Sequence, residues 1–225
     1  MNRFFVFEKK DNYFVLSKET LNHLKVIRTK NKPFICVYEQ EFYLCMQENN
    51  LAKIIEKLPG NHEQDFEVVL AMSIIKLDRF EWLLQKATEL GVTKIIPMHT
   101  RYCDGDLVKY KFEKKIERFR SILQNAAEQS FRNKVPSFER IHTFEEVLSL
   151  NINQKFLAHE KINTSLQLEN KIDHDVLFLV GPEGGFSEEE IALAQEQDVQ
   201  LVSLGSRILR AETAAIYLLS QIKMK

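Results

Sequence analysis

Residues 177–191 read Leu-Phe-Leu-Val-Gly-Pro-Glu-Gly-Gly-Phe-Ser-Glu-Glu-Glu-Ile, an apolar run followed by a glycine-rich turn and the start of a helix. The apolar run before Gly181 predicts a buried strand. Ser187 with Glu190 three positions later is a capping box, which begins a helix directly after the turn. This order is typical of an open α/β sheet, whose ligands bind beyond the carboxyl ends of its strands.

A second segment repeats this pattern further along the chain. Residues 202–216 read Val-Ser-Leu-Gly-Ser-Arg-Ile-Leu-Arg-Ala-Glu-Thr-Ala-Ala-Ile, again a strand end, a loop and an apolar helix. Charged side chains among apolar ones are costly unless they are paired or used, so either a structural ion pair or a functional site is indicated. Of the seven glycines, four follow an apolar strand and predict a pocket: Gly181, Gly184, Gly185 and Gly205.

The glycine-rich turn differs from the common phosphate-binding loops. It contains neither GxGxxG nor GxxxxGK[ST], so a dinucleotide or nucleoside triphosphate site is disfavoured. The alternative to a ligand site is a plain connecting turn whose acidic residues complement the dipole of the following helix.

The rest of the C-terminal part alternates strand and helix patterns. Residues 68–72, 93–97, 155–158 and 199–204 are further apolar runs of strand length. Between them, helical spacing is shown by Phe80, Leu83, Leu84 and Ala87, and again by Phe112, Ile116, Phe119, Leu123 and Ala126. We therefore expect a parallel sheet that helices cover on both faces.

The N-terminal part has a different pattern. Short aromatic and β-branched runs at 4–7, 13–16, 33–38 and 41–46 predict strands of a small β-barrel. The cluster Pro59-Gly60-Asn61-His62 interrupts them, and we place a domain boundary near residue 66, giving domains 1–66 and 67–225.

Composition restricts the classes of protein that this chain can represent. With 44% hydrophobic and 28% charged residues it is an ordinary globular protein, and without a signal peptide or a long apolar run it is expected in the cytoplasm and off the membrane. Three cysteines without CxxC spacing and six scattered histidines predict no metal site. The net charge is −1, yet residues 1–32 hold eight Lys or Arg against three acids, so this end could meet a polyanion.

The two glycine-bearing segments together resemble a known family signature. Gly-Pro-Glu-Gly-Gly at 181–185 and Leu-Gly-Ser-Arg-Ile-Leu-Arg-Ala-Glu-Thr-Ala at 204–214 are similar to those of the RsmE family of 16S ribosomal RNA uridine N3-methyltransferases, in the SPOUT superfamily. Residues 3–5, 23–28, 78–91 and 127–132 also resemble this family. One departure is Ala211, where the family has threonine.

The resemblance implies a fold, a cofactor and a partner. It implies an N-terminal PUA-like β-barrel, a C-terminal SPOUT-type domain with a trefoil-knotted parallel sheet, and a homodimer. The substrate would be 16S ribosomal RNA, naked or within the small ribosomal subunit. S-adenosylmethionine would be held by Leu179, Gly181, Pro182, Gly184, Gly185, Leu204, Gly205, Ile208, Leu209 and Thr213.

The same resemblance suggests catalytic and RNA-binding residues. The proton on uridine N3 must leave as the nitrogen attacks the methyl group, so Glu212 and Glu183 are candidate bases and Arg210 could stabilise charge on the uracil oxygens. Residues that could hold RNA are Arg3, His23, Lys25, Arg28, Arg101 and Arg132, although each basic side chain could equally be a solvated surface residue.

Two other functions stay open at this stage. A different SPOUT methyltransferase could modify a ribose 2′-hydroxyl or a transfer-RNA base, because a fold does not fix its substrate. A noncatalytic RNA-binding or ribosome-assembly factor could keep the fold without binding the cofactor. Mapping of the methylated position and titration with S-adenosylmethionine distinguish these functions.

Overall fold

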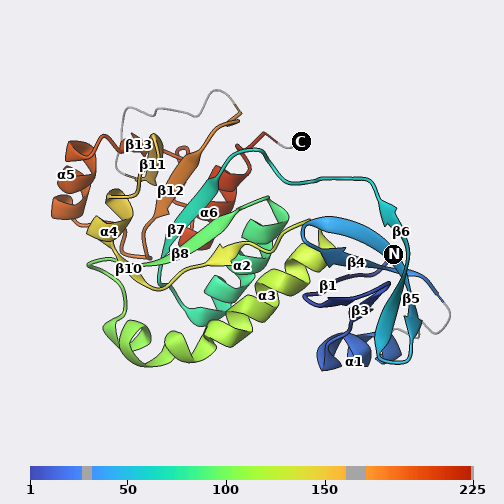
Figure 1. Ribbon diagram of the computed structural model, residues 1–225. Coiled ribbons are helices and arrows are strands. Elements are labelled where there is room, and N and C mark those ends of the chain that lie inside the picture. The colour runs from blue at the N-terminus through green and yellow to red at the C-terminus, as the bar shows by residue number, and fades with distance from the viewer. Residues whose placement is uncertain (27–31, 161–170, 224–225) are drawn as a thin grey trace. The chain divides into compact units, whose positions relative to one another are not determined.

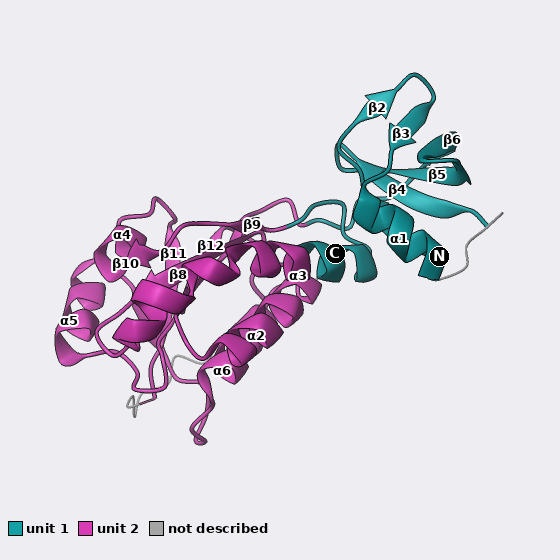
Figure 2. Cartoon of the chain, turned by 90° about the horizontal axis from the view of Figure 1, so that it is seen from below, with its two compact units in different colours: residues 1–63, 124–135 teal, residues 64–123, 136–225 magenta. Residues whose placement is uncertain are grey.

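Two compact units make up the chain in the computed structural model, which describes residues 1–26, 32–160 and 171–223. Unit 1 comprises residues 1–63 and 124–135, and unit 2 comprises 64–123 and 136–225, as Figure 2 shows in teal and magenta. A single cut near residue 66 would assign 124–135 to the second unit, whereas these residues cluster with the first.

Unit 1 is built on a mixed sheet of six strands, in the order β1-β4-β5-β6-β3-β2. Among its described strands, β1 and β4 pair in parallel and the other neighbours pair antiparallel. Buried phenylalanines, among them Phe4, Phe14 and Phe34, fill its core against the helix α1. The elements are β1 (Arg3–Phe5), β2 (Lys9–Lys10), β3 (Tyr13–Val15), α1 (Lys18–Val26), β4 (Phe34–Tyr38), β5 (Glu41–Glu48) and β6 (Leu51–Leu58).

The C-terminal end of helix α3 (Ile116–Gln129) is bound to strand β1, which explains why 124–135 belong to unit 1. Arg3 donates from Nε to the carbonyl oxygen of Glu128 at 2.6 Å and from Nη2 to that of Gln129 at 2.8 Å. The Arg3 guanidinium also lies 4.3 Å from the centre of the Phe131 ring. A cation at the last carbonyls of a helix satisfies acceptors that have no partner within the helix.

Unit 2 contains a parallel sheet of seven strands, in the order β10-β8-β7-β12-β11-β13 with β9 beside β8. All residues of the neighbouring strands β7 and β12 are buried, as the two apolar runs predict. The strands are β7 (Val68–Ser73), β8 (Lys94–His99), β9 (Ser137–Phe138), β10 (His142–Thr143), β11 (Gln154–Ala158), β12 (Val176–Val180) and β13 (Gln200–Val202).

Helices cover both faces of this sheet (Figure 1). On one face, Leu177 and Leu179 of β12 pack in a core with Phe144 and other side chains of α4 (Phe144–Leu148) and α5 (Glu188–Glu196). On the other face lie α2 (Leu77–Glu89) and α6 (Ala211–Leu219), which contact each other. The predicted arrangement of a parallel sheet between helix layers is confirmed.

Three adjacent strands place their following loops at one edge of the sheet. Strand β11 lies between β12 and β13, and all three run in the same direction. The segments after them, at 159–160, 181–186 and 203–210, therefore gather at the carboxyl edge, where open α/β sheets bind ligands. In the described residues, no helix is long and apolar enough to span a membrane.

Candidate functional site

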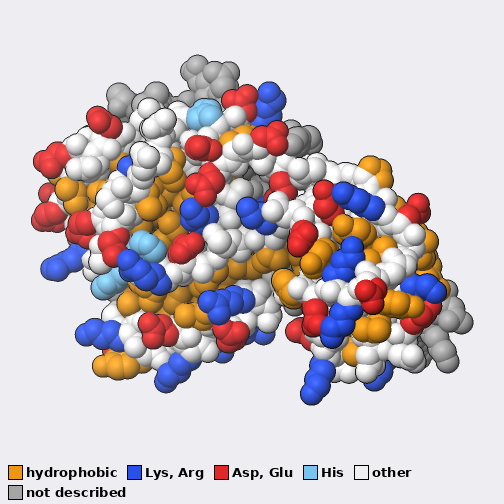
Figure 3. Space-filling view, in the orientation of Figure 1, with side chains coloured by type: hydrophobic (Ala, Val, Ile, Leu, Met, Phe, Trp, Pro, Cys, Tyr) orange, Lys and Arg blue, Asp and Glu red, His pale blue; other side chains and the backbone are white. Residues whose placement is uncertain are grey.

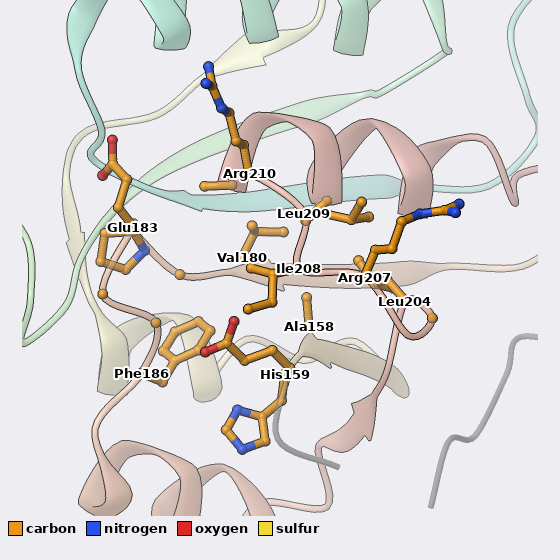
Figure 4. A pocket seen from close by; sticks show the side chains of 18 of the residues that line it. Ala158, His159, Val180, Glu183, Phe186, Leu204, Arg207, Ile208, Leu209 and Arg210 are labelled. Atoms are coloured by element: carbon orange, nitrogen blue, oxygen red, sulfur yellow. The ribbon is translucent and has the colours of Figure 1, made fainter. Parts of the chain in front are cut away.

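A pocket of about 330 Å³ lies at this carboxyl edge, within unit 2. Residues 158–160, 180–186, 204–211 and Ala214 line it, so both glycine-bearing segments contribute to one cavity (Figure 4). The volume falls in the range of small-molecule sites, about 300–1,000 Å³. The prediction that the two segments form one pocket is confirmed.

The glycines of the first loop are required by close packing at Gly181 and Gly184 and by backbone conformation at Gly185. A Cβ atom at Gly181 would lie 3.1 Å from the backbone carbon of Gly185 and from the Phe186 ring. A Cβ atom at Gly184 would lie 3.0 Å from the Cβ of Tyr102, a distance that real Cβ atoms rarely show. Gly185 has a φ of +70°, a left-handed conformation that favours glycine.

The second loop presents an apolar side chain to solvent. Ile208 is 82% exposed although isoleucine is usually buried, and it lines the pocket. In Figure 4 its side chain points into the space between the two loops, toward Phe186. Gly205 has a φ of +111°, which turns the chain between β13 and this residue. An exposed apolar group inside a concavity indicates a surface that a ligand covers.

The predicted capping box is confirmed, and it begins α5 directly after Phe186, which lines the pocket. The Ser187 hydroxyl accepts from the backbone N–H of Glu190, whose carboxylate in turn accepts from the N–H of Ser187. Phe186, directly before it, packs on Phe144 with ring centres 5.4 Å apart. The Glu190 carboxylate also accepts from the N–H of Arg101 at 2.9 Å, which ties the turn after β8 to the start of α5.

Helix α2 contributes a cation that links the first loop to the start of α6. The Nη1 atom of Arg79 lies 2.9 Å from Oε1 of Glu183 in the first loop, and its Nε atom lies 4.0 Å from Oε1 of Glu212 in the first turn of α6. The Glu212 side chain is only 9% exposed, and its Oε2 has no hydrogen-bond partner among the described residues. Arg79 therefore compensates charge on both carboxylates.

The structure brings together most of the residues predicted for the cofactor. Eight of them line the pocket together with Glu183 and Arg210: Gly181, Pro182, Gly184, Gly185, Leu204, Gly205, Ile208 and Leu209. Leu179 and Thr213 do not, because Leu179 is buried in the core under α4 and α5 and Thr213 is exposed on α6. Glu212 does not line the pocket, and its Oε1 lies 4.0 Å from Nε of Arg79.

Sequence reasoning missed several residues of the pocket. His159 and Glu160 follow β11, and Phe186, Arg207 and Ala211 complete the two loops. The signal for the first pair was present, because residues 155–158 are an apolar strand and the rule that ligands bind beyond strand ends applies to it as well. Arg79 could not be placed from spacing, since it is 104 positions from Glu183.

The residues proposed to hold RNA lie in different environments. His23 and Lys25 are exposed on α1, Arg101 is exposed after β8, and Arg28 lies outside the described residues. Arg3 is engaged with the end of α3, as described above. The Arg132 side chain is 6% exposed and pairs with Glu63 inside unit 1, so its guanidinium is not presented to a phosphate in this structure.

No group of three His, Cys, Asp or Glu residues that could hold a metal ion occurs in the described ranges.

Comparisons with known proteins identify relatives of this chain. A family model described as an RNA methyltransferase domain matches residues 62–223. The ribosomal RNA small subunit methyltransferase E of Mesomycoplasma hyopneumoniae is 41% identical over 98% of each chain. The protein of the same name from Bacillus subtilis is 32% identical, over 93% of this chain and 89% of its own length.

Solved structures show the same fold. A ribosomal RNA small subunit methyltransferase E from Neisseria gonorrhoeae, bound to S-adenosylmethionine, superposes with a TM-score of 0.85 at 29% identity, over 98% of this chain and 95% of its own. A Legionella pneumophila protein with bound S-adenosylmethionine has a TM-score of 0.86, also at 29% identity, over 97% and 95% of the chains. Together with the pocket, these similarities establish that the chain belongs to the RNA methyltransferase family that includes the ribosomal RNA small subunit methyltransferases E.

Proposed function

We propose that this protein transfers a methyl group from S-adenosylmethionine to N3 of a uridine in small-subunit ribosomal RNA. The observation that carries the proposal is that the loops 181–186 and 204–211 together line one pocket. Relatives that align over nearly the whole chain carry the name of this enzyme, and one similar structure was solved with this cofactor bound.

The pocket has the chemical character that S-adenosylmethionine requires. Ile208, Phe186 and Val180 offer apolar contacts for an adenine ring and a thioether chain, and the glycines allow backbone N–H and C=O groups to approach a ligand closely. Charged side chains also line the cavity at Glu160 and Arg207, where ribose hydroxyls and an amino-acid group could be recognised.

When bound, the cofactor would supply a methyl group attached to a positively charged sulfur. After transfer of the methyl group, this sulfur is part of a neutral thioether, which is the leaving group. Uridine N3 must lose its proton to attack that methyl group. We assign the acceptance of this proton to the carboxylate of Glu183, which lines the pocket and is 46% exposed. Arg79 holds this carboxylate in position through Oε1. Arg210, exposed at the N-cap of α6, stabilises negative charge on the uracil oxygens. Glu212 acts as a positioning residue for Arg79.

The finer points of architecture belong to the same proposal. Unit 2 would be the trefoil-knotted SPOUT domain, and the sheet of unit 1 the PUA-like RNA-binding domain of a cytoplasmic enzyme. A homodimer is supported by two large aromatic side chains on the contacting helices α2 and α6, because Trp82 is 47% and Tyr217 is 46% exposed. Sedimentation of the wild type against Trp82→Ala/Tyr217→Ala tests this assembly, and a monomeric wild type would refute it.

The reaction itself is tested with purified protein and labelled S-adenosylmethionine. Small-subunit RNA without the modification is offered both as naked RNA and as assembled subunits, and the product is digested and mapped by mass spectrometry. A base methyl at uridine N3 is the expected result. A ribose methyl would instead indicate a different methyltransferase, and absence of cofactor binding in calorimetry would indicate a noncatalytic factor.

The Glu183→Gln variant tests the assignment of the base. The amide keeps the shape of the side chain and removes its proton-accepting charge, so kcat should fall about 10²-fold or more while the Kd for S-adenosylmethionine changes little. A variant with unchanged kcat would exclude Glu183 as the base.

A further inference from the structure

The segment between β8 and α3 carries exposed cations beside exposed aromatic side chains. We call it the β8–α3 surface, and it consists of Arg101, Tyr102, Lys109, Tyr110, Lys111, Lys114 and Lys115, all exposed. Residues 101–115 thus contain five Lys or Arg and three acidic residues, Asp104, Asp106 and Glu113. Figure 3 shows Lys and Arg side chains with hydrophobic ones between them at the lower left, around this segment.

The backbone under this surface is fixed. Asp104 accepts from the N–H groups of Asp106 and Leu107, which starts the π-helix η1 (Leu107–Lys111). Phe112 is fully buried against Phe80 and Phe119, with ring centres 5.0 Å from each. Single turns of π-helix are frequent at functional sites. The exposed side chains of η1 therefore project from a rigid base.

The cations of the β8–α3 surface differ from their neighbours in α3. Arg118 pairs with Glu81 at 2.6 Å and Arg120 with Glu117 at 2.8 Å. Within the described part of the chain, none of the five cations of the surface forms a salt bridge to a carboxylate. Cations that are not neutralised by the protein are available to phosphates, and each phosphate contact releases counterions.

The aromatic residues connect this surface to the pocket. Tyr102 is 54% and Tyr110 is 61% exposed, so both rings are accessible to a partner. Tyr102 also lies against the first pocket loop: a Cβ atom added at Gly184 would be 3.0 Å from the Cβ of Tyr102. Exposed tyrosines next to cations are the combination that binds single-stranded RNA, with bases stacked on the rings and phosphates held between them.

We propose that the β8–α3 surface binds the unpaired RNA strand next to the methylated uridine. Lys109 and Lys111 contact its phosphates, and Tyr110 stacks on a base. Arg101 and Tyr102 continue this track to the loop 181–186 of the pocket. This inference rests on the proposed function, and it assigns RNA contacts to the methyltransferase unit itself.

The charge component is tested by removing two cations. Lys109→Gln/Lys111→Gln is compared with Lys171→Gln/Lys223→Gln, which removes the same charge from exposed sites elsewhere in unit 2, where Lys171 donates to the Ser220 carbonyl and Lys223 pairs with Asp173. Binding of a single-stranded small-subunit RNA fragment is measured by anisotropy at several salt concentrations. The first variant should lose affinity on the order of tenfold, and its salt slope should fall by about one to two, with the control unchanged.

The stacking component is tested at Tyr110. Tyr110→Ala should weaken RNA binding about tenfold, whereas Tyr110→Phe should retain it because the ring remains. Affinity for S-adenosylmethionine is measured for all variants and should match the wild type. The melting temperature should match it in the variants at Lys109, Lys111 and Tyr110, whereas a lower value in the lysine control would reflect its lost contacts with Ser220 and Asp173. In one outcome, the wild type methylates the RNA while the lysine and alanine variants bind it as tightly as the controls do. That result would exclude RNA binding by the β8–α3 surface and leave the proposed function intact. If the wild type neither binds S-adenosylmethionine nor methylates, the proposed function fails first.

Discussion

Arg79 donates to Glu183 at 2.9 Å across a separation of 104 residues, and this ion pair fastens helix α2 to the glycine-rich loop of the pocket. On its other side the same guanidinium lies 4.0 Å from the nearly buried carboxylate of Glu212. Arg79, which does not line the cavity, thus connects the first pocket loop to the start of α6, directly after the second loop.

Replacing Arg79 by alanine should impair both stability and cofactor binding. The variant leaves Glu212 buried without its neighbouring charge, which costs about 1–3 kcal/mol in the free energy of unfolding. It also releases Glu183, so the KM for S-adenosylmethionine should rise and kcat should fall. Arg118→Ala is the matched control, because it removes another arginine–glutamate pair of α2, at Glu81. Identical kinetics in the two variants would contradict a positioning role for Arg79.

The pocket could be located from sequence because both loops carry local signals. A strand end, a glycine turn and the Ser187–Glu190 capping box are encoded within a few residues, and the structure contains each of them. The alternation of strand and helix patterns likewise predicted the parallel sheet. The relation of Arg79 to Glu183 depends on how α2 packs, and no local pattern specifies it.

Charge alone was a poor guide to the role of individual arginines. Arg3 and Arg132 were candidates for RNA because they are basic and resemble family positions. The structure instead places Arg3 on the last carbonyls of α3 and Arg132 in a buried pair with Glu63. Whether a cation is solvated or neutralised depends on long-range contacts, which also explains why the cations at 109–115 were not singled out.

Substitution of Gly184 by alanine should weaken cofactor binding through Tyr102. The new Cβ would lie 3.0 Å from the Cβ of Tyr102, tighter than ordinary contact, so the loop 181–186 or the turn at Tyr102 must move by a few tenths of an ångström. We expect the Kd for S-adenosylmethionine to rise on the order of tenfold in calorimetry. Gly105→Ala is the control, since no atom lies within 4 Å of its added Cβ. Wild-type affinity in Gly184→Ala would show that this loop does not hold the cofactor.

Truncation of Ile208 separates ligand binding from folding. Its side chain is 82% exposed, so Ile208→Ala should leave the melting temperature unchanged. If S-adenosylmethionine covers this side chain, the loss of its apolar contact costs about 1–2 kcal/mol, and the Kd rises roughly five- to thirtyfold. Ile55→Ala in unit 1, at a residue that is 53% exposed, should change neither quantity. An unchanged Kd for Ile208→Ala would remove this residue from the cofactor site.

Glu146 should make the stability of the fold depend on pH in the acid range. It lies in helix α4, which covers one face of the parallel sheet. Its hydrogen bonds with Arg140, and then with the N–H of Thr143 at the helix N-cap, lower the pKa of Glu146 from its ordinary 4.5 to about 2. A depressed pKa stabilises the fold above the ordinary value, and this contribution is lost as the pH falls through about 2. Glu146→Gln should therefore melt below the wild type at pH 6, and the two melting temperatures should converge as the pH falls from 4.5 to 2. Glu145→Gln, in the same turn, serves as the control because Glu145 is exposed. Melting curves of Glu146→Gln that stay parallel to the wild type across this range would show that the capping carboxylate contributes no pH-dependent stability.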